Sequence, residues 1–480
     1  MQFFTGGTIL EETMRENKMG TMPVNKLLIS MAVPIMISML VQALYNIVDS
    51  IFVAKYSADC MTAISLVFPL QSLMIATGAG IGVGMNALLS RRLGEKDQDG
   101  VNITAINGIM VYACCYILFL MVGLFAAAPF MNSQSESQNI VAEGTVYLKY
   151  VCCFSMGMYA QFCFERMLQS TGKTILSMIT QIVGAVTNII LDPIMIFGLL
   201  GCPRMGMKGA AIATVIGQCV AGILALCLNL KLNKEIQLVK FRTIQPTLKE
   251  MGKILYIGIP SILMASIGSI MVLLINTIFS NMSIIDTELP LDEARNTAIA
   301  IFGIYFKLQS FIFMPVFGLN NGMVPIVAFC YGAGKRDRMM KTVKLSVAYA
   351  FALLLFGMAV FQLIPDKLLM LFANEDNMSH ILQMGIPALR TISIHFPIAS
   401  FCIISLSVFQ ALGKGFLSMG VSFARQLIVL VPVAFLLSLT QKVSNVWFAF
   451  VLAEVISITL CAFAFKHIYK TLISKIPAGA

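Results

Sequence analysis

The sequence predicts an all-α membrane protein in which twelve transmembrane helices form two pseudo-symmetric lobes of six helices each. Of its 480 residues, 58% are hydrophobic and only 12% are charged, which is about half the charged share of a soluble domain. Apolar runs of about 20 residues or more recur along the whole chain, and a helix of that length crosses a bilayer core. The strands of a membrane barrel would be much shorter, at about ten alternating residues.

The expected spans lie near residues 27–54, 62–89, 102–128, 145–167, 174–200, 208–230, 254–281, 296–326, 341–365, 386–411, 415–440 and 445–467. Lys and Arg gather in the even-numbered loops and in both tails, so the positive-inside rule predicts that both termini are cytoplasmic. The net charge of +10 therefore reflects topology, and no nucleic-acid partner is expected. The polar first 20 residues do not resemble a cleaved signal peptide.

The longest basic connection divides the spans six and six. The expected organisation is a cytoplasmic segment (1–26), an N-terminal lobe (27–230), an inter-lobe loop (231–253), a C-terminal lobe (254–467) and a cytoplasmic tail (468–480).

The two lobes are expected because the chain contains an internal repeat. Leu70-Gln71-Ser72 recurs as Leu308-Gln309-Ser310, and this gapless match at an offset of 238 continues through the glycine pair Gly94/Gly332. The segments 169–178 and 410–419 match at an offset of 241. Six spans separate the copies, so both have the same orientation. Parallel repeats of this kind are related by an axis along the membrane normal.

The polar residues of the fifth span are the strongest indication of a functional site. Asn188 and Asp192 are four residues apart and share one helix face, and Gln181 continues the same stripe two turns earlier. Pro193 lacks an N–H group, which disposes this helix to kink. A carboxylate in hydrocarbon is costly, so it is a functional-site hypothesis by default. A structural Asp satisfied by neighbouring helices is the alternative.

Further polar residues extend this candidate site to two more spans. Gln42, Asn46 and Asp49 fall on one face of the first span, and Thr214 ends a run of small residues in the sixth. If spans one, five and six pack together, two carboxylates with Asn188 and Thr214 could hold a proton or share Na⁺. The repeat counterparts of the two acids are Asn276 and Val433. The ionisable site is therefore expected in one half only.

The chain resembles a bacterial transporter of the multidrug and toxic compound extrusion (MATE) family over residues 19–470. Four stretches carry the resemblance: MGTMPVNKLLISMAVPIMISMLVQALYNIVDSIFVAKY, NIILDPIMIFGLLGCPRMGMKGAAIATVIGQ, GLNNGMVPIVAFCYGAGKRDR and FQALGKGFLSMGVSFARQLIVLVPV. The resemblance implies a monomeric exporter in the bacterial cytoplasmic membrane, with no cofactor, which exchanges small cationic drugs or metabolites against H⁺ or Na⁺. It also implies a cation site at Asp49, Asn188, Asp192 and Thr214. Because spans seven and ten contain no acid, the resemblance is to the branch whose cation site lies in the N-terminal lobe alone.

Four glutamine and asparagine residues in the spans are candidates to line a cavity. Candidate cavity or substrate residues are Gln42, Asn46, Gln181 and Gln309. The twelve scattered cysteines contain no CxxC motif, so neither a disulfide framework nor a structural metal is expected. A flippase for lipid-linked sugars is the alternative within the same superfamily. An intramembrane aspartyl enzyme using Asp49 and Asp192 is the remote alternative, because its GxGD motif is absent.

Several charged residues in the expected spans have no assigned function. We interpret Arg425 and Glu454 as a structural ion pair or as interfacial residues, and Lys307 as a packing or gating residue. His395 is expected to be a hydrogen-bonded residue of helix packing, with proton sensing as the alternative. Glu165 and Arg166 are expected to be a solvated pair at a cytoplasmic helix end.

Overall fold

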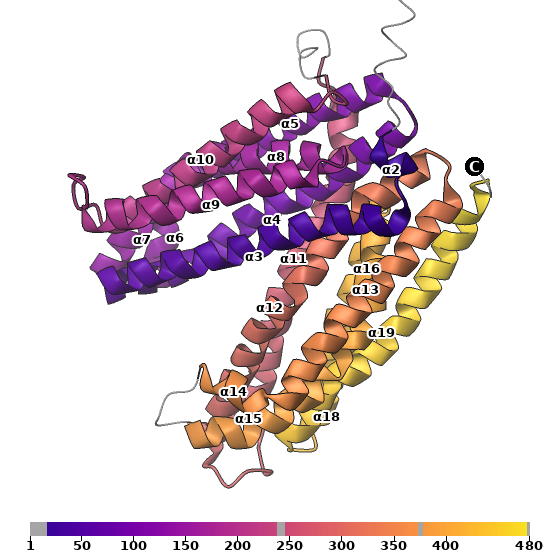
Figure 1. Cartoon of the computed structure of the whole chain (residues 1–480). Coiled ribbons are helices and arrows are strands. Elements are labelled where there is room, and N and C mark those ends of the chain that lie inside the picture. Colours follow the sequence, from indigo (N-terminus) through magenta and orange to yellow (C-terminus); the bar gives the residue numbers. More distant parts are fainter. Residues whose placement is uncertain (1–16, 238–244, 373–377, 478–480) are drawn as a thin grey trace, which may run out of the picture. The chain divides into compact units, whose positions relative to one another are not determined.

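The computed structural model describes residues 17–237, 245–372 and 378–477, and all regular secondary structure in this part of the chain is helical (Figure 1). Ten of the described helices are long and apolar enough to cross a membrane, and the number is eleven when a bent pair is taken as one span. The predicted all-α membrane class is therefore confirmed.

The first half of the chain contains a short helix and a series of long ones: α2 (Lys18–Thr21), α3 (Val24–Tyr56), α4 (Ala58–Gly94), α5 (Gln98–Met121), the π-helix η1 (Val122–Ala126), α6 (Ala127–Gln134), α7 (Gln138–Cys153), α8 (Met156–Ser170), α9 (Thr174–Phe197) and α10 (Met207–Leu232).

The second half has a similar order of long helices but a π-helix at a different place. Its elements are α11 (Leu248–Asn281), α12 (Leu291–Gly332), α13 (Arg336–Leu363), α14 (Pro365–Met370), α15 (Met378–Ser393), α16 (His395–Ala411), α17 (Gly415–Phe423), the π-helix η3 (Ala424–Leu430), α18 (Val431–Ser438), α19 (Val443–Thr471) and the 3₁₀ turn η4 (Ile473–Lys475).

Two of the expected spans are broken, and the breaks are equivalent in the repeat. The fourth span is divided into α7 and α8, which have 16 and 15 residues and are separated by Phe154 and Ser155. The tenth is divided into α15 and α16, which are bent by 45° at Ile394. Ile394 matches Cys153, the last residue of α7, at the offset of 241 found in the sequence. The count of twelve spans thus includes α7 and α8 as one span, although this pair does not meet the length and hydropathy test.

The chain divides into two compact units that do not follow the two halves of the sequence. The first unit is 1–262 with 321–335, and the second is 263–320 with 336–480. Helices α11 and α12 are therefore each divided between the two units. The lobe boundaries expected from the sequence remain a prediction.

Glycines allow α4 and α12 to pack backbone against backbone inside the first unit. A Cβ atom on Gly94 would lie 2.1 Å from the carbonyl oxygen of Phe329, and one on Gly332 would lie 2.0 Å from that of Arg91. Arg91 and Phe329 are themselves equivalent at the offset of 238. The contact therefore has local two-fold symmetry, which the repeat predicts for a pair of equivalent helices.

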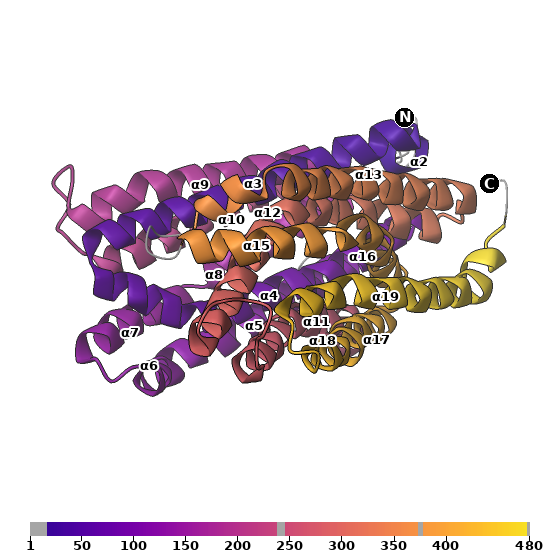
Figure 2. The same ribbon diagram turned by 90° about the horizontal axis from the view of Figure 1, so that it is seen from below.

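Small residues also set the spacing of the helices that carry the candidate site. Helix α9 packs against α3, α8 and α10, and the views in Figures 1 and 2 show α3 and α9 running alongside each other. A Cβ atom on Gly184 of α9 would lie 2.8 Å from Cβ of Ala221, and one on Gly217 of α10 would lie 2.8 Å from the Gly184 carbonyl oxygen. Polar side chains on α9 and α10 are therefore held within hydrogen-bonding distance of one another.

The loop before α12 caps the last long helix of the second unit. Asp286 accepts hydrogen bonds from the backbone N–H groups of Val443 and Ser444, each at 2.9 Å, and from the Ser444 hydroxyl at 2.7 Å. Partial burial alone would raise the pKa of Asp286, but these hydrogen bonds to its charged form outweigh it and hold the pKa below its usual range. Asp286 thus acts as a cap for the N-terminus of α19.

We predict that Asp286→Asn lowers the temperature at which the detergent-purified protein unfolds, because loss of a helix cap costs about 1 kcal/mol. The pKa of Asp286 is lower in the folded protein than in the unfolded chain. Its stabilising effect is therefore fully present above the unfolded pKa of about 3.9 and lost as the pH falls through the folded value. The single tryptophan, Trp447, lies in α19 four residues after Val443 and reports on this end of the helix.

The matched control is Asp292→Asn, because the Asp292 side chain is 93% exposed and lies 3.5 Å from Arg295, a kind of pair that contributes little. Wild type and Asp286→Asn should differ at neutral pH and converge in acid, whereas Asp292→Asn should follow wild type throughout. An equal unfolding temperature for Asp286→Asn and wild type at pH 7 would contradict the capping role.

Candidate functional site

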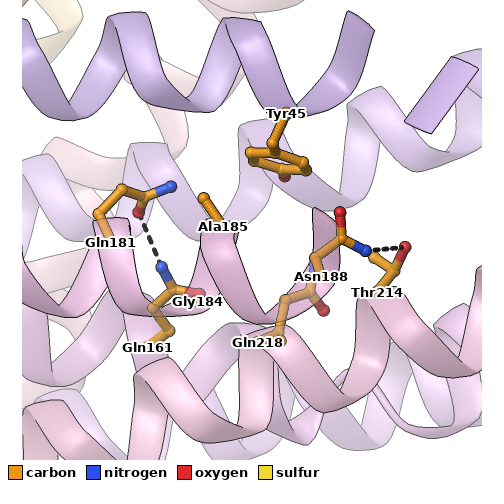
Figure 3. Close-up of a pocket in the computed structure, with 9 residues that line it drawn as sticks. Tyr45, Gln161, Gln181, Gly184, Ala185, Asn188, Thr214 and Gln218 are labelled. Atoms are coloured by element: carbon orange, nitrogen blue, oxygen red, sulfur yellow. Dashed lines mark hydrogen bonds between the residues drawn. The ribbon is translucent and has the colours of Figure 1, made fainter. Parts of the chain in front are cut away.

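The structure brings together the polar residues predicted on the fifth and sixth spans. The side-chain amide of Asn188 donates to Oδ1 of Asp192 at 3.2 Å and to Oγ1 of Thr214 at 3.4 Å, the second bond being drawn in Figure 3. All three residues are buried, and Asp192 is 0% exposed. The Asn188 amide therefore bonds to a residue one turn later on its own helix and also connects α9 to α10.

The carboxyl group of Asp49 on α3 completes the cluster. It lies within hydrogen-bonding reach of the Asp192 carboxyl group, and such a bond between two carboxyl groups requires one of them to carry a proton. Three oxygens have no hydrogen-bond donor among the described residues, namely Oδ1 of Asp49, Oδ2 of Asp192 and Oδ1 of Asn188. Burial without a donor is costly for a polar atom, so these oxygens are suited to hold a proton or a hard cation.

A small polar pocket adjoins the cluster. It is lined by Tyr45 from α3, Gln161 from α8, Gln181 from α9 and Gln218 from α10, together with the glycines and Ala185 at the α9–α10 contact (Figure 3). The space open to the centre of a water molecule is about 20 Å³, which is room for one water. The pocket in this conformation therefore admits a water molecule or a single ion and is far too small for a drug-sized molecule.

A row of hydrogen bonds continues from the pocket along the α8–α9 contact. The amide of Gln161 donates to Oε1 of Gln181 at 2.7 Å and to Oε1 of Glu165 at 3.0 Å, and the hydroxyl of Thr180 donates to the same Glu165 oxygen at 2.8 Å. Arg166 donates to Oε1 of Gln169 at 2.8 Å.

The prediction that Glu165 and Arg166 form a solvated pair is wrong. The two residues are only 8% and 9% exposed, and their side chains bond to glutamine and threonine rather than to each other. Their position near a helix end suggested solvent, but α8 packs against α4, α5, α9 and α10. Which side of α8 faces these helices cannot be read from a short, mixed stretch of sequence.

The four residues suggested for the cavity or substrate are placed differently. Gln181 lines the pocket. Gln42 is half-buried and Asn46 exposed on α3, and neither lines the pocket. Gln309 is half-buried on α12 and belongs to the second unit.

Sequence reasoning missed Tyr45, Gln161 and Gln218. Helical spacing would have found two of them, because Tyr45 lies one turn before Asp49 and Gln218 lies one turn after Thr214. Gln161 lies on α8, which carries no predicted site residue to point to it.

The remaining polar residues of the spans have structural contacts. Arg425 and Glu454 form an ion pair, with Nη1 3.6 Å from Oε1. His395 is buried with Nδ1 2.6 Å from the Ile392 carbonyl oxygen, which confirms a hydrogen-bonded packing role. The ammonium group of Lys307 lies 5.8 Å from the centre of the Phe372 ring. No cluster of three or more His, Cys, Asp or Glu residues in the described part of the chain could hold a metal ion.

Paired carboxyl groups inside a bundle of long apolar helices, here with Asp192 buried and Asp49 half-buried, are typical of a membrane transporter. The comparisons with known proteins place the chain among transporters. The model of the MatE family matches residues 34–194 and 269–436, and the chain belongs to this family of transporters. The intramembrane enzyme is thereby set aside.

Relatives and solved structures cover nearly the whole chain. The multidrug export protein MepA of Staphylococcus haemolyticus is 27% identical over 462 residues, which are 93% of each chain. An outward-facing conformation of a multidrug resistance MATE family transporter of the MOP superfamily has a TM-score of 0.84 at 22% identity, covering 98% of this chain and 99% of that one. A MATE in complex with MaL6 has a TM-score of 0.84 at 22% identity, covering 95% and 100%.

Proposed function

We propose that this protein is a secondary active multidrug exporter that exchanges amphipathic organic cations against H⁺, or against Na⁺, across the bacterial cytoplasmic membrane. The observation that carries the proposal is the Asp49–Asp192 pair, in which Asp192 is fully buried and Asp49 is half-buried with its Oδ1 atom buried. The Asn188 amide bonds to Asp192, and both carboxyl groups have an oxygen without a donor among the described residues. The multidrug export protein among its relatives supports drug export as the function. An acidic site favours such a cargo over a lipid-linked sugar.

Coupling follows from competition for one negative site. When both carboxylates are ionised, their charge attracts the cationic drug. When the pair binds a proton, the two carboxyl groups can hydrogen-bond to each other and the attraction is lost. Antiport needs only that the drug and the coupling ion favour different states of one site. Na⁺ would act in the same way, held by the oxygens of Asp49, Asp192, Asn188 and Thr214.

The proposal includes the organisation expected from the sequence. The protein acts as a monomer with both termini in the cytoplasm, and its N-terminal lobe (27–230) holds the site. The C-terminal lobe (254–467) provides a matching scaffold without a titratable pair at the equivalent positions. The asymmetric loop charges support this orientation.

We predict that Asp49→Asn and Asp192→Asn each abolish gradient-driven drug efflux from cells without unfolding the protein. The amide removes the titratable group and also the cost of burying a charge, so stability should be kept or raised. The measurement is the rate of loss of a fluorescent cation from loaded, energised cells.

Asn276→Ala is the matched control, because Asn276 is the repeat counterpart of Asp49. It should retain efflux, because Asn276 carries no titratable group and its side-chain oxygen has no hydrogen-bond partner among the described residues. Near-normal efflux by either Asp variant would refute the coupling role, and an inactive, folded Asn276→Ala would refute its restriction to the first half.

We further predict that binding of a fluorescent organic cation to the purified protein weakens as the pH falls, because protonation of the pair removes the charge that attracts the drug. Drug binding at intermediate pH should also release protons, as linkage requires. A titration between about pH 5 and pH 8 covers the range in which such a switch could operate.

Asp192→Asn is the control for this titration and should flatten the dependence on pH. A binding constant independent of pH in both wild type and variant would exclude the proton version. Weaker binding in Na⁺ than in an equal concentration of choline would then favour the sodium version.

A further inference from the structure

The second unit contains an ion pair between the half-buried Arg425 and the buried Glu454, which the proposed transport cycle does not use. Nη1 of Arg425, on the π-helix η3, lies 3.6 Å from Oε1 of Glu454 on α19. Both of these atoms are buried and neither makes a hydrogen bond with any described residue. The hydroxyl group of Tyr305, close enough to interact electrostatically with both charges, is also buried without a partner in the described structure.

Arg425 occupies the position that corresponds to a pocket residue of the first half. At the offset of 241 that relates 169–178 to 410–419, Arg425 corresponds to Gly184 and Ser422 corresponds to Gln181. Both Gly184 and Gln181 line the small polar pocket. The π-helical segment η3 begins at Ala424, immediately before the arginine that replaces the glycine.

Glu454 corresponds to another pocket residue, Gln218. The segment 213–218, ATVIGQ, aligns with 449–454, AFVLAE, at an offset of 236. The burial of the two helices supports this register. Eight positions buried in α10 are also buried in α19 at the same offset: Met207/Val443, Ala210/Val446, Ala211/Trp447, Ala213/Ala449, Thr214/Phe450, Gly217/Ala453, Ala221/Ser457 and Ala225/Cys461.

The geometry of the pair differs from that of an optimised structural salt bridge. An Arg–carboxylate pair selected for strength is commonly bidentate, with N–O distances below about 3 Å. Here the two closest atoms are 3.6 Å apart and have no other partners among the described residues. A buried ion pair is also weak evidence for stability, because desolvation offsets the attraction. The pair is better explained as a Glu454 carboxylate site that the Arg425 guanidinium group occupies as its cation.

We propose that Glu454 is the carboxylate of a second, pseudo-symmetric cation pocket, and that the guanidinium group of Arg425 is its permanently tethered cation. The first-half pocket has a glycine where this arginine stands, and so it remains open to an external ion. The second-half pocket is filled by the chain itself. Removal of the arginine side chain should therefore open a site for small guanidinium ions.

The test is chemical rescue of Arg425→Ala by methylguanidinium. The purified variant is heated with a thiol-reactive dye, which reports unfolding through the twelve free cysteines, several of them buried. Methylguanidinium should raise the unfolding temperature of Arg425→Ala in a saturable way, as a ligand that binds only the folded state does. Equal concentrations of tetramethylammonium should not, because that ion has no N–H donors for Glu454.

Three controls make the result specific to the pocket. Wild type should not respond to methylguanidinium, because the Arg425 side chain fills the pocket. Arg425→Ala/Glu454→Gln should not respond, because the carboxylate that would bind the ion is gone. Arg390→Ala removes an exposed arginine of α15 in the same unit and should also not respond. No stabilisation of Arg425→Ala, or equal stabilisation of the double variant, would overturn the proposal.

A second measurement applies if Arg425→Ala cannot be purified. In that case the misfolding of Arg425→Ala is attributed to the unpaired Glu454 carboxylate. Neutralising this group in Arg425→Ala/Glu454→Gln should therefore restore folded protein. Loss of both variants would overturn the proposal, because it would show that the arginine serves packing rather than charge. Neither measurement involves drug efflux, so the outcome is independent of the proposed transport function.

Discussion

The pairing of the fully buried Asp192 with the half-buried Asp49 in an apolar helix bundle is the constraint on which the rest of the site depends. Asp49 and Asp192 come from different helices, so their approach requires α3, α9 and α10 to pack closely. Gly184 and Gly217 make the close packing of α9 and α10 possible, because a Cβ atom on either glycine would clash with the facing helix. The resulting separation allows one amide, that of Asn188, to bond to both Asp192 and Thr214. The pair cannot remain doubly charged without a partner, and a coupling ion or a cationic cargo can supply one.

The two halves of the chain use one scaffold in two ways. Their glycines make equivalent backbone contacts at Gly94 and Gly332, and their fourth and tenth spans are broken within one residue of equivalent positions. In the first half, the space next to the scaffold is lined by glutamine side chains and glycine. In the second half, the corresponding space holds Arg425 and Glu454. We infer that duplication preserved the helix packing and that the polar residues then diverged, so that one half keeps an open site and the other is closed by its own charges.

The sequence predicted the fold class because apolar runs of bilayer length are independent of tertiary detail. It also placed Asn188 and Asp192 on one helix face, because a spacing of four residues fixes their direction. It did not predict the burial of Glu165 and Arg166, since that depends on which helices surround α8. Nor did it reveal the π-helical segment at Arg425, because a local change of helix type leaves no clear periodic pattern. The sequence showed that α4 and α12 are copies of one segment, but it did not show that the two copies contact each other.

The central claim is that one buried carboxylate pair exchanges a coupling ion for an organic cation. The most direct measurement is the flux of a fluorescent cation into or out of proteoliposomes under an imposed pH gradient, compared with an imposed Na⁺ gradient of equal size. The account predicts that one of these gradients drives the cation against its own concentration gradient in wild type and that neither drives it in Asp192→Asn. Equal transport by wild type and Asp192→Asn, or transport by wild type that is indifferent to both gradients, would contradict it.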